Sequence, residues 1–175
     1  MRTRQPLPRI WLVTDERQPD LIAAVGRLPP GAGILFRHHG LQEAERRALF
    51  SRVRAAADPE ELVLLLAGSP AVAREWGADG WHGWEAGEGL RSAPVHNLDE
   101  VRRAEAQGAS LLFLSPVFPT RSHPGVRGMG TRRFARLARL ARRPVIALGG
   151  VTQASGAKLM RLGAHGWAGI DAWNA

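Results

Sequence analysis

Short apolar runs alternate with amphipathic stretches along the whole chain. Eight runs of three to six residues are mostly apolar, which is typical of parallel strands covered on both faces. In chain order they are 9–14, 33–37, 62–67, 80–84, 94–96, 110–114, 144–148 and 166–170. Between them, apolar residues with the spacing of one helix face predict helices over 20–28, 41–57, 70–76, 97–107, 131–141 and 153–162. The pattern therefore predicts strands and helices alternating around a parallel sheet.

Two folds fit this alternation, an open doubly wound sheet and a closed (β/α)8 TIM barrel. Against the open dinucleotide-binding sheet, Asp15-Glu16-Arg17 follows the first strand, where a G-x-G-x-x-G loop would be expected. The count of eight favours the barrel, as does Gly149-Gly150 after the seventh strand, where barrels often build a phosphate site. Since 175 residues are few for a fold of typically about 250, we expect one compact domain over 1–175 with a truncated last helix.

The composition excludes several classes of protein. There is no cysteine, which rules out a disulfide framework, a zinc ribbon and a thiol nucleophile. No apolar run approaches the roughly 18–20 residues that span a bilayer, and the first eight residues do not read as a signal peptide. We therefore expect a cytoplasmic protein with no membrane partner.

The net charge is +8 with a pI of about 11.6, and 23 of the 24 basic residues are arginine. Such a charge can indicate a nucleic-acid partner. Six of the arginines crowd one predicted amphipathic helix and the residues after it: Arg132, Arg133, Arg136, Arg139, Arg142 and Arg143. There is no interleaved aromatic row, helix-turn-helix or RNA-recognition motif. We interpret the arginines as a solvated outer face and expect no nucleic-acid partner.

The chemistry of a barrel lies on the loops that follow its strands. Here these loops hold the following polar residues and glycines: Asp15, Arg37, His38, His39, Glu85, Glu88, His96, Gly149, Gly150 and Asp171. Arginine with several histidines suits an anionic ligand, and backbone N–H groups at a glycine pair can cradle a phosphate. A metal site built from His38, His39, His82 and His123 would lack ligand spacing such as H-E-x-x-H, so we predict no metal site.

The loop after the sixth strand carries the most specific motif. Residues 115–125 read SPVFPTRSHPG, which resembles the G-P-V-F-x-T-x-T-K pattern of the thiamine phosphate synthase family of small barrels. Six further segments match that family in order, over 9–15, 34–37, 76–82, 95–100, 147–151 and 162–166. The chain is therefore identified as a divergent member of the thiamine phosphate synthase and thiazole tautomerase family.

The resemblance implies a role in thiamine (vitamin B1) biosynthesis. Family synthases join hydroxymethylpyrimidine diphosphate to thiazole phosphate and release pyrophosphate, with Mg²⁺ as the expected cofactor. Family tautomerases aromatise a thiazole carboxylate phosphate by moving a proton. By this resemblance the catalytic residues are Arg37, His39 and His123. The substrate- and phosphate-binding residues are Pro119, Thr120, Ser122, Gly149, Gly150 and Asp171.

The departures from the family pattern lie at the positions that bind the diphosphate and Mg²⁺ in the family. His39 and His123 stand where the family has two lysines that hold the diphosphate. Ala67-Gly68 replaces the Asn-Asp whose aspartate binds Mg²⁺, and no aspartate follows the fourth strand. Only Glu85 or Glu88 is at hand to replace these carboxylates, of which Mg²⁺ usually needs one or two.

Two more positions keep alternative functions open. Asp171 replaces a family serine near the phosphate, where like charges about 4 Å apart cost about 4 kcal/mol at an effective dielectric of about 20. Pro116 stands where the tautomerases have a histidine. The alternative to a synthase is a repurposed barrel, tautomerase-like or non-catalytic, that binds a small phosphorylated ligand or a protein partner. A truncated last helix would also leave the eighth strand uncovered, which favours a homodimer.

Overall fold

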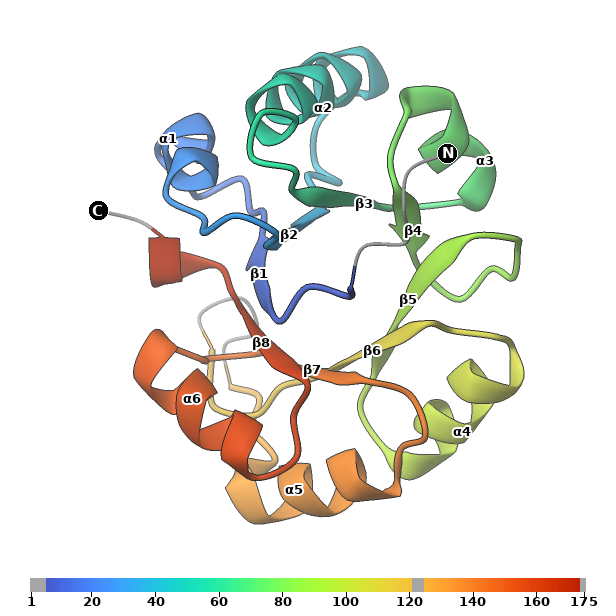
Figure 1. The fold of residues 1–175 in the computed structure, drawn as a ribbon, viewed down its shortest axis with the longest axis vertical. Helices are drawn as coiled ribbons and strands as arrows, with labels where there is room; N and C mark the ends of the chain where they lie inside the picture. Colours follow the sequence, from blue (N-terminus) through green and yellow to red (C-terminus); the bar gives the residue numbers. More distant parts are fainter. Residues whose placement is uncertain (1–5, 121–124, 174–175) are drawn as a thin grey trace.

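The computed structural model describes residues 6–120 and 125–173 (Figure 1). Eight parallel strands pair in chain order, and β8 (Gly166–Gly169) pairs with β1 (Ile10–Val13) to close the barrel. The other strands are β2 (Gly33–Phe36), β3 (Val63–Ala67), β4 (Gly80–His82), β5 (Leu90–Val95), β6 (Leu111–Leu114) and β7 (Val145–Ala147). The predicted (β/α)8 barrel is confirmed.

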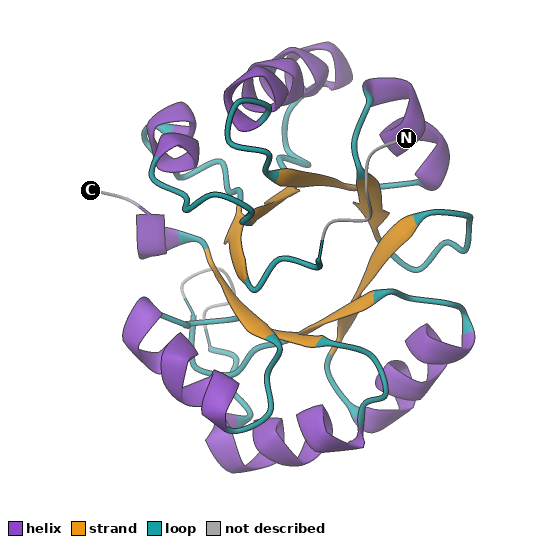
Figure 2. Cartoon of the chain, in the orientation of Figure 1, coloured by secondary structure: helices purple, strands orange, loops and turns teal. Residues whose placement is uncertain are grey.

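The α-helices lie outside the barrel, in two groups on opposite sides (Figure 2). Those along one side are α1 (Leu21–Gly26), α2 (Glu43–Ala57) and α3 (Pro70–Trp76), and those along the other are α4 (Leu98–Ala106), α5 (Gly130–Leu140) and α6 (Gln153–Arg161). Local sequence sets several of their starts. Ser69 caps α3 with proline in the first turn, and the Asn97 side chain accepts the Glu100 N–H at the start of α4. The predicted helices are present, with bounds that shift by one or two residues.

The fifth strand begins earlier than the sequence pattern predicts. It starts at Leu90 rather than at Pro94, because Arg91 and Ser92 belong to the strand although both are polar. Both side chains are buried, at 1% and 0% exposure. Their polarity hides the strand from a search for apolar runs.

Apolar side chains fill the interior of the barrel and the space under its helices. Trp11, Leu65 and Phe113 belong to the interior cluster, and Leu7 packs against it from the segment that precedes β1. Two separate clusters lie under the helices, one against α1, α2 and α3 and the other against α4, α5 and α6. Trp11, Trp81 and Trp167 are all buried, as the sequence predicts for core tryptophans: 0%, 3% and 3% exposed.

No helix stands between β4 and β5; a loop over residues 83–89 covers the outer face of β4 instead. The Trp81 indole N–H donates to the Glu85 carbonyl at 2.9 Å. Gly87 approaches the same indole so closely that a Cβ there would lie 3.1 Å from it. Trp81 and this loop together do the covering that a helix does elsewhere around the barrel.

The buried Arg91 guanidinium ties this loop to α4. Its Nη1 donates to the carbonyls of Trp84 and Glu85 at 3.1 and 3.2 Å, and its Nη2 donates to the Ala104 carbonyl at 3.0 Å. Arg91 is therefore a buried structural cation in the wall of the barrel. It is an exception to the interpretation of the arginines as a solvated outer face.

The chain after β8 forms one 3₁₀ turn, η1 (Asp171–Trp173), in place of a last helix. Trp173 stacks on Trp167 with ring centroids 5.7 Å apart, and Arg27 of the α1 C-cap donates to the Trp173 carbonyl at 3.2 Å. All four residues of β8 are buried. Strand eight is thus covered by its own chain, so the homodimer remains a prediction without the exposed flank that suggested it.

Among the described residues, no helix combines the length and the apolar character needed to cross a membrane.

Candidate functional site

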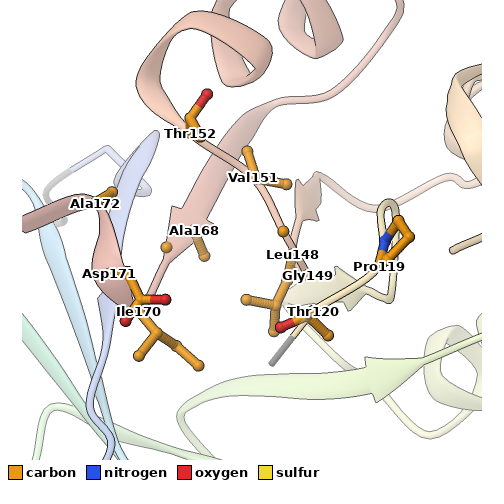
Figure 3. Close-up of a pocket in the computed structure, with 12 residues that line it drawn as sticks. Pro119, Thr120, Leu148, Gly149, Val151, Thr152, Ala168, Ile170, Asp171 and Ala172 are labelled. Atoms are coloured by element: carbon orange, nitrogen blue, oxygen red, sulfur yellow. The ribbon is translucent and has the colours of Figure 1, made fainter. Parts of the chain in front are cut away.

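A pocket of about 300 Å³ opens where β7 and β8 end (Figure 3). We call it the β7–β8 pocket; it is lined by Pro119, Thr120, Leu148, Gly149, Gly150, Val151, Thr152, Ala168, Gly169, Ile170, Asp171 and Ala172. Of the substrate-binding residues predicted from sequence, Pro119, Thr120, Gly149, Gly150 and Asp171 all line it. Ser122 and His123 lie outside the described residues.

The backbone of Gly149 and Gly150 requires glycine at both positions. Their φ angles are +95° and +61°, in the left-handed region that side chains disfavour. A Cβ at Gly149 would lie 2.7 Å from the Cα of Pro116, and one at Gly150 would lie 2.5 Å from the Pro119 carbonyl. The loop after β6 therefore packs directly on the glycine pair.

This packing leaves hydrogen-bond donors for a ligand. In the part of the chain that the structure describes, neither the Gly149 nor the Gly150 N–H donates to another residue. The pocket also reaches Thr152, the N-cap of α6, whose side chain accepts the Ser155 N–H. Free main-chain N–H groups beside a helix N-terminus suit a phosphate group.

Asp171 faces this donor set across the pocket. Figure 3 shows Asp171 and Ile170 on the β8 side, opposite Thr120 and Leu148. The Asp171 side chain is exposed, and its charge lies near the Arg17 guanidinium. The pKa of Arg17 is raised, first by its hydrogen bond to Asp15 and to a smaller extent by the Asp171 charge. Arg17 thus offsets part of the negative charge at this edge of the pocket.

A second, smaller pocket of about 130 Å³ lies between the loops that follow β1 and β2. It is lined by Thr14, Asp15, Glu16, Arg37, His38, His39 and Gly40. Glu16 holds the two loops together, because its Oε1 accepts the Gly40 N–H at 2.7 Å. Two of the predicted catalytic residues, Arg37 and His39, therefore lie together. They follow β2, which pairs with β1, and β1 pairs with β8, so they lie on the β8 side of the barrel mouth.

Arg46 of α2 brings a fixed cation to the same edge of the barrel, which the sequence analysis missed. Its Nε donates to the Arg37 carbonyl and its Nη2 to the Ala67 carbonyl, both at 2.7 Å. The guanidinium also lies over the rings of Phe36 and Trp76, 5.8 and 5.4 Å from their centroids. Burial lowers the pKa of Arg46, yet arginine stays charged in proteins, so a positive group caps the ends of β2 and β3.

The histidines after β2 are uncharged at neutral pH. Burial lowers the pKa of His38, and burial with the charges of Arg46 and Arg37 lowers the pKa of His39. The Thr14 hydroxyl accepts the Arg37 N–H and lies 2.9 Å from Nδ1 of His38. His39 can thus accept a proton but does not supply the positive charge of the lysine it replaces.

His82 at the end of β4 is a second residue that the sequence analysis did not assign to the site. Its Nδ1 lies 2.8 Å from the Ser92 hydroxyl, and its ring meets Phe113 edge to face. Burial, with smaller contributions from the charges of Arg37 and His39, lowers its pKa to about 3. His82 therefore presents a neutral imidazole beside Arg37 in the barrel mouth. It could have been found only by pairing β4 with β5, since Ser92 lies ten residues further along the chain.

The residues at the strand ends do not fit the Mg²⁺ that the family implies. Within residues 6–120 and 125–173, no three His, Asp or Glu side chains are grouped so that they could hold a metal ion. Ala67-Gly68 ends β3 without a carboxylate, and Arg46 already binds the Ala67 carbonyl. Mg²⁺ needs oxygen ligands, so a guanidinium at this place opposes its binding.

Comparison with known proteins shows which family the chain is similar to. The family model TMP-TENI, thiamine monophosphate synthase, matches residues 92–173, from β5 to η1. The "Putative thiamine-phosphate synthase 2" of Aquifex aeolicus is 28% identical over 94% of this chain and 97% of its own length. The thiamine-phosphate synthase of Chloroflexus aurantiacus is 33% identical over 49% of this chain, but this match covers only 40% of that protein.

A solved structure shows the same fold. The thiamine phosphate pyrophosphorylase from Pyrococcus furiosus superposes with a TM-score of 0.80 at 23% identity, over 95% of this chain and 88% of that one. The chain is thus similar to the thiamine monophosphate synthase family model over residues 92–173 and to the Aquifex aeolicus protein over most of its length.

Proposed function

We propose that the protein acts in thiamine biosynthesis as a thiamine-phosphate synthase, joining hydroxymethylpyrimidine diphosphate to thiazole phosphate. The observation that carries this proposal is the β7–β8 pocket, where two glycine N–H groups that have no partner among the described residues lie beside the start of α6. The substrates are small phosphorylated molecules, so the reaction needs neither a nucleic acid nor a membrane. A cytoplasmic location and a homodimer belong to the same proposal.

The chain's own residues can hold both substrates. The β7–β8 pocket binds the thiazole phosphate through the amides of Gly149 and Gly150. The thiazole nitrogen then bonds to the methylene carbon of the pyrimidine, the bond from that carbon to oxygen breaks, and pyrophosphate leaves with the electron pair. Arg37 supplies positive charge for the leaving group, and Arg46 supports it from the end of β2. His39 and His82 are neutral there and act as hydrogen-bonding groups.

A second candidate function is binding of the thiazole phosphate without transfer, in a repurposed barrel. The observation that favours it is the mouth described above, where the described residues include no group of three candidate metal ligands and a neutral histidine stands in place of one lysine. A barrel of this kind keeps phosphate recognition and loses the means to stabilise a leaving diphosphate.

The two functions are separated by measuring pyrophosphate release and ligand binding on the same preparation. The purified protein is incubated with both substrates, with and without Mg²⁺, beside an active synthase as a positive control. Thiazole phosphate binding is followed by calorimetry. Release that depends on the protein establishes the synthase, and binding without release establishes the second candidate. If the folded protein neither binds thiazole phosphate nor releases pyrophosphate, both functions are excluded.

Replacing Gly150 with alanine is expected to abolish thiazole phosphate binding. The new Cβ would collide with the Pro119 carbonyl at a left-handed φ, so the loop must move and displace the amide donors. We expect at least a tenfold loss of affinity by calorimetry, at about 1.4 kcal/mol per factor of ten. The matched control is Gly26→Ala, at a position where a Cβ meets nothing within 4 Å. Equal affinities for the two variants would remove the glycine pair from the binding site.

Replacing Asp171 with serine is expected to tighten phosphate binding about tenfold, by removing a carboxylate from the edge of the pocket. The gain should shrink as salt is added, because both the ligand and Asp171 are exposed to solvent. Asp99→Ser, an exposed change on α4 outside the pocket lining, serves as the control. An Asp171 variant with unchanged affinity would mean that the phosphate does not sit beside this carboxylate.

A further inference from the structure

The net positive charge of the protein comes from one part of the chain. Residues 126–175 contain nine Lys+Arg and one Asp+Glu, a net charge of +8. The first 125 residues contain fifteen of each and are neutral. The last fifty residues thus account for the whole net charge. They form α5, β7, α6 and β8, so the charge lies on one side of the barrel (Figure 1).

Helix α5 presents this charge as a row. Its exposed side chains and those of the turn after it include six arginines: Arg132, Arg133, Arg136, Arg139, Arg142 and Arg143. Within the described residues, none of these six guanidinium groups has an ion pair or a hydrogen bond to another residue. The opposite face of the helix is buried through Phe134 and Leu137. The row is therefore held rigidly and left open to solvent.

The neighbouring helices extend the row into a surface. Arg102 and Arg103 are exposed on α4, and Lys158 and Arg161 are exposed on α6. We call these four residues together with the six arginines the arginine face. A hollow of about 470 Å³ lies within it, between the ends of α4 and α5, and is lined by Arg102, Glu105, Ala106, Leu140, Arg142 and Arg143.

The acidic residue in this hollow does not neutralise its arginines. Glu105 accepts the main-chain N–H groups of Arg142 and Arg143, the latter at 3.0 Å. Its carboxylate is thus bound by main-chain N–H groups. Among the described residues, the guanidinium groups around it form no ion pair with it, and their N–H donors stay available to a ligand. A concave surface with several unpaired guanidinium groups is suited to several phosphates at once.

The charge works against the stability of α5 itself. Arg132 and Arg136 are four residues apart, and Arg133, Arg136 and Arg139 are spaced by three, so like charges are neighbours along the helix. Two arginines also occupy the first turn, where the helix dipole favours acidic residues, and no side chain caps the start. A bound polyanion would relieve both effects.

Three kinds of polyanionic partner differ in what else they need. An anionic membrane would need exposed apolar side chains, but on this face only Leu140 is a large exposed hydrophobic residue, at 47%. A second copy of the chain would need an acidic face, and the remainder of the chain is neutral. The phosphodiester backbone of a nucleic acid needs only spaced cations, which the arginine face supplies.

We propose that the arginine face binds the phosphodiester backbone of a nucleic acid without reading its sequence. The sequence contains no recognition motif and no row of aromatic residues, which is why we expected no nucleic-acid partner from it. Those two absences exclude base reading and base stacking, and backbone binding requires neither. The site is separate from the β7–β8 pocket, so it stands or falls independently of the proposed function.

The test is the salt dependence of binding to labelled 20-base-pair DNA and RNA duplexes of unrelated sequence, followed by fluorescence anisotropy. Engagement of about five phosphates predicts a slope of log affinity against log salt concentration of about −4.5 on DNA. A triple variant, Arg132→Gln, Arg136→Gln and Arg139→Gln, should bind at least tenfold more weakly with a slope shallower by about three. The control triple variant, Arg47→Gln, Arg52→Gln and Arg74→Gln, removes equal charge from α2 and α3 and should change both values little.

The outcomes separate the partners. Preference for one duplex identifies DNA or RNA as the source of the backbone, and both results support the proposal. Equal binding to poly-glutamate or to anionic vesicles would overturn it, as would equal losses in the two triple variants. Arg136→Glu adds a check on folding, since it should raise the melting temperature by about 1–3 °C while weakening duplex binding. A variant that is more stable and still binds as tightly would also contradict the proposal.

Discussion

Replacing Arg91 with methionine is expected to lower the free energy of unfolding by about 3–4 kcal/mol. Methionine fills much of the same volume but has no donors for the carbonyls of Trp84, Glu85 and Ala104. The Trp84 and Glu85 carbonyls belong to the loop between β4 and β5, which has no helix of its own, and the Ala104 carbonyl belongs to α4. Equilibrium unfolding in urea, followed by tryptophan fluorescence and circular dichroism, measures the loss.

Arg102→Met is the matched control for this prediction. It makes the same chemical change on α4, but at an exposed side chain, so we expect a change within about 0.5 kcal/mol. Similar stability of the two variants would show that the Arg91 guanidinium does not tie the loop to α4. A lysine at the same position tests geometry, because a single ammonium cannot reach carbonyls on both sides as the guanidinium fork does.

Acid is expected to destabilise the protein through His82, by about 3 kcal/mol between pH 6.5 and pH 4. In the folded protein the pKa of His82 is lowered to about 3, whereas in the unfolded chain it is near 6.5. Below pH 6.5 the unfolded state therefore binds more protons than the folded state, and stability falls as the pH falls. The contribution is fully present above pH 6.5 and is lost as the pH falls toward 3.

Unfolding measured across this range, on the native chain and on His82→Gln, checks the prediction. Glutamine can still hydrogen-bond to Ser92 but does not titrate, so the slope should flatten in this variant. Lowered pKa values of His38 and His39 act in the same direction and leave a smaller residual slope. A His82→Gln protein as acid-sensitive as the native chain would contradict the assignment.

The barrel could be predicted because parallel strands buried on both faces leave short apolar runs that composition and spacing reveal. The exceptions have a common cause. Arg91 and Ser92 look like loop residues in the sequence, yet each finds a buried partner that only the folded wall provides. The uncovered eighth strand was expected from the missing helix, whereas Trp173 covers it by stacking on Trp167.

The candidate site likewise has one part that could be predicted from the sequence and one part that could not. The β7–β8 pocket could be anticipated, because a glycine pair after a strand limits the backbone to few roles and the loop after β6 carries a family motif. The cation of Arg46 and the His82–Ser92 pair could not. Arg46 reaches the strand ends from a neighbouring helix, and its spacing in the sequence is that of an ordinary solvated helix residue.

The part of the barrel between β4 and β5 also marks a seam, that is, a boundary between two halves of the molecule. One outer apolar cluster joins β1–β4 to α1, α2 and α3, the other joins β5–β8 to α4, α5 and α6, and the family match begins at residue 92, just past this seam. The β7–β8 pocket lies in the half that the family model matches, whereas Arg37, His39, Arg46 and His82 lie in the other half. The molecule can therefore be regarded as two modules. Grafting β1–β4 of an active synthase onto residues 92–173 would then replace Arg37, His39 and His82 together and leave the lining of the β7–β8 pocket unchanged.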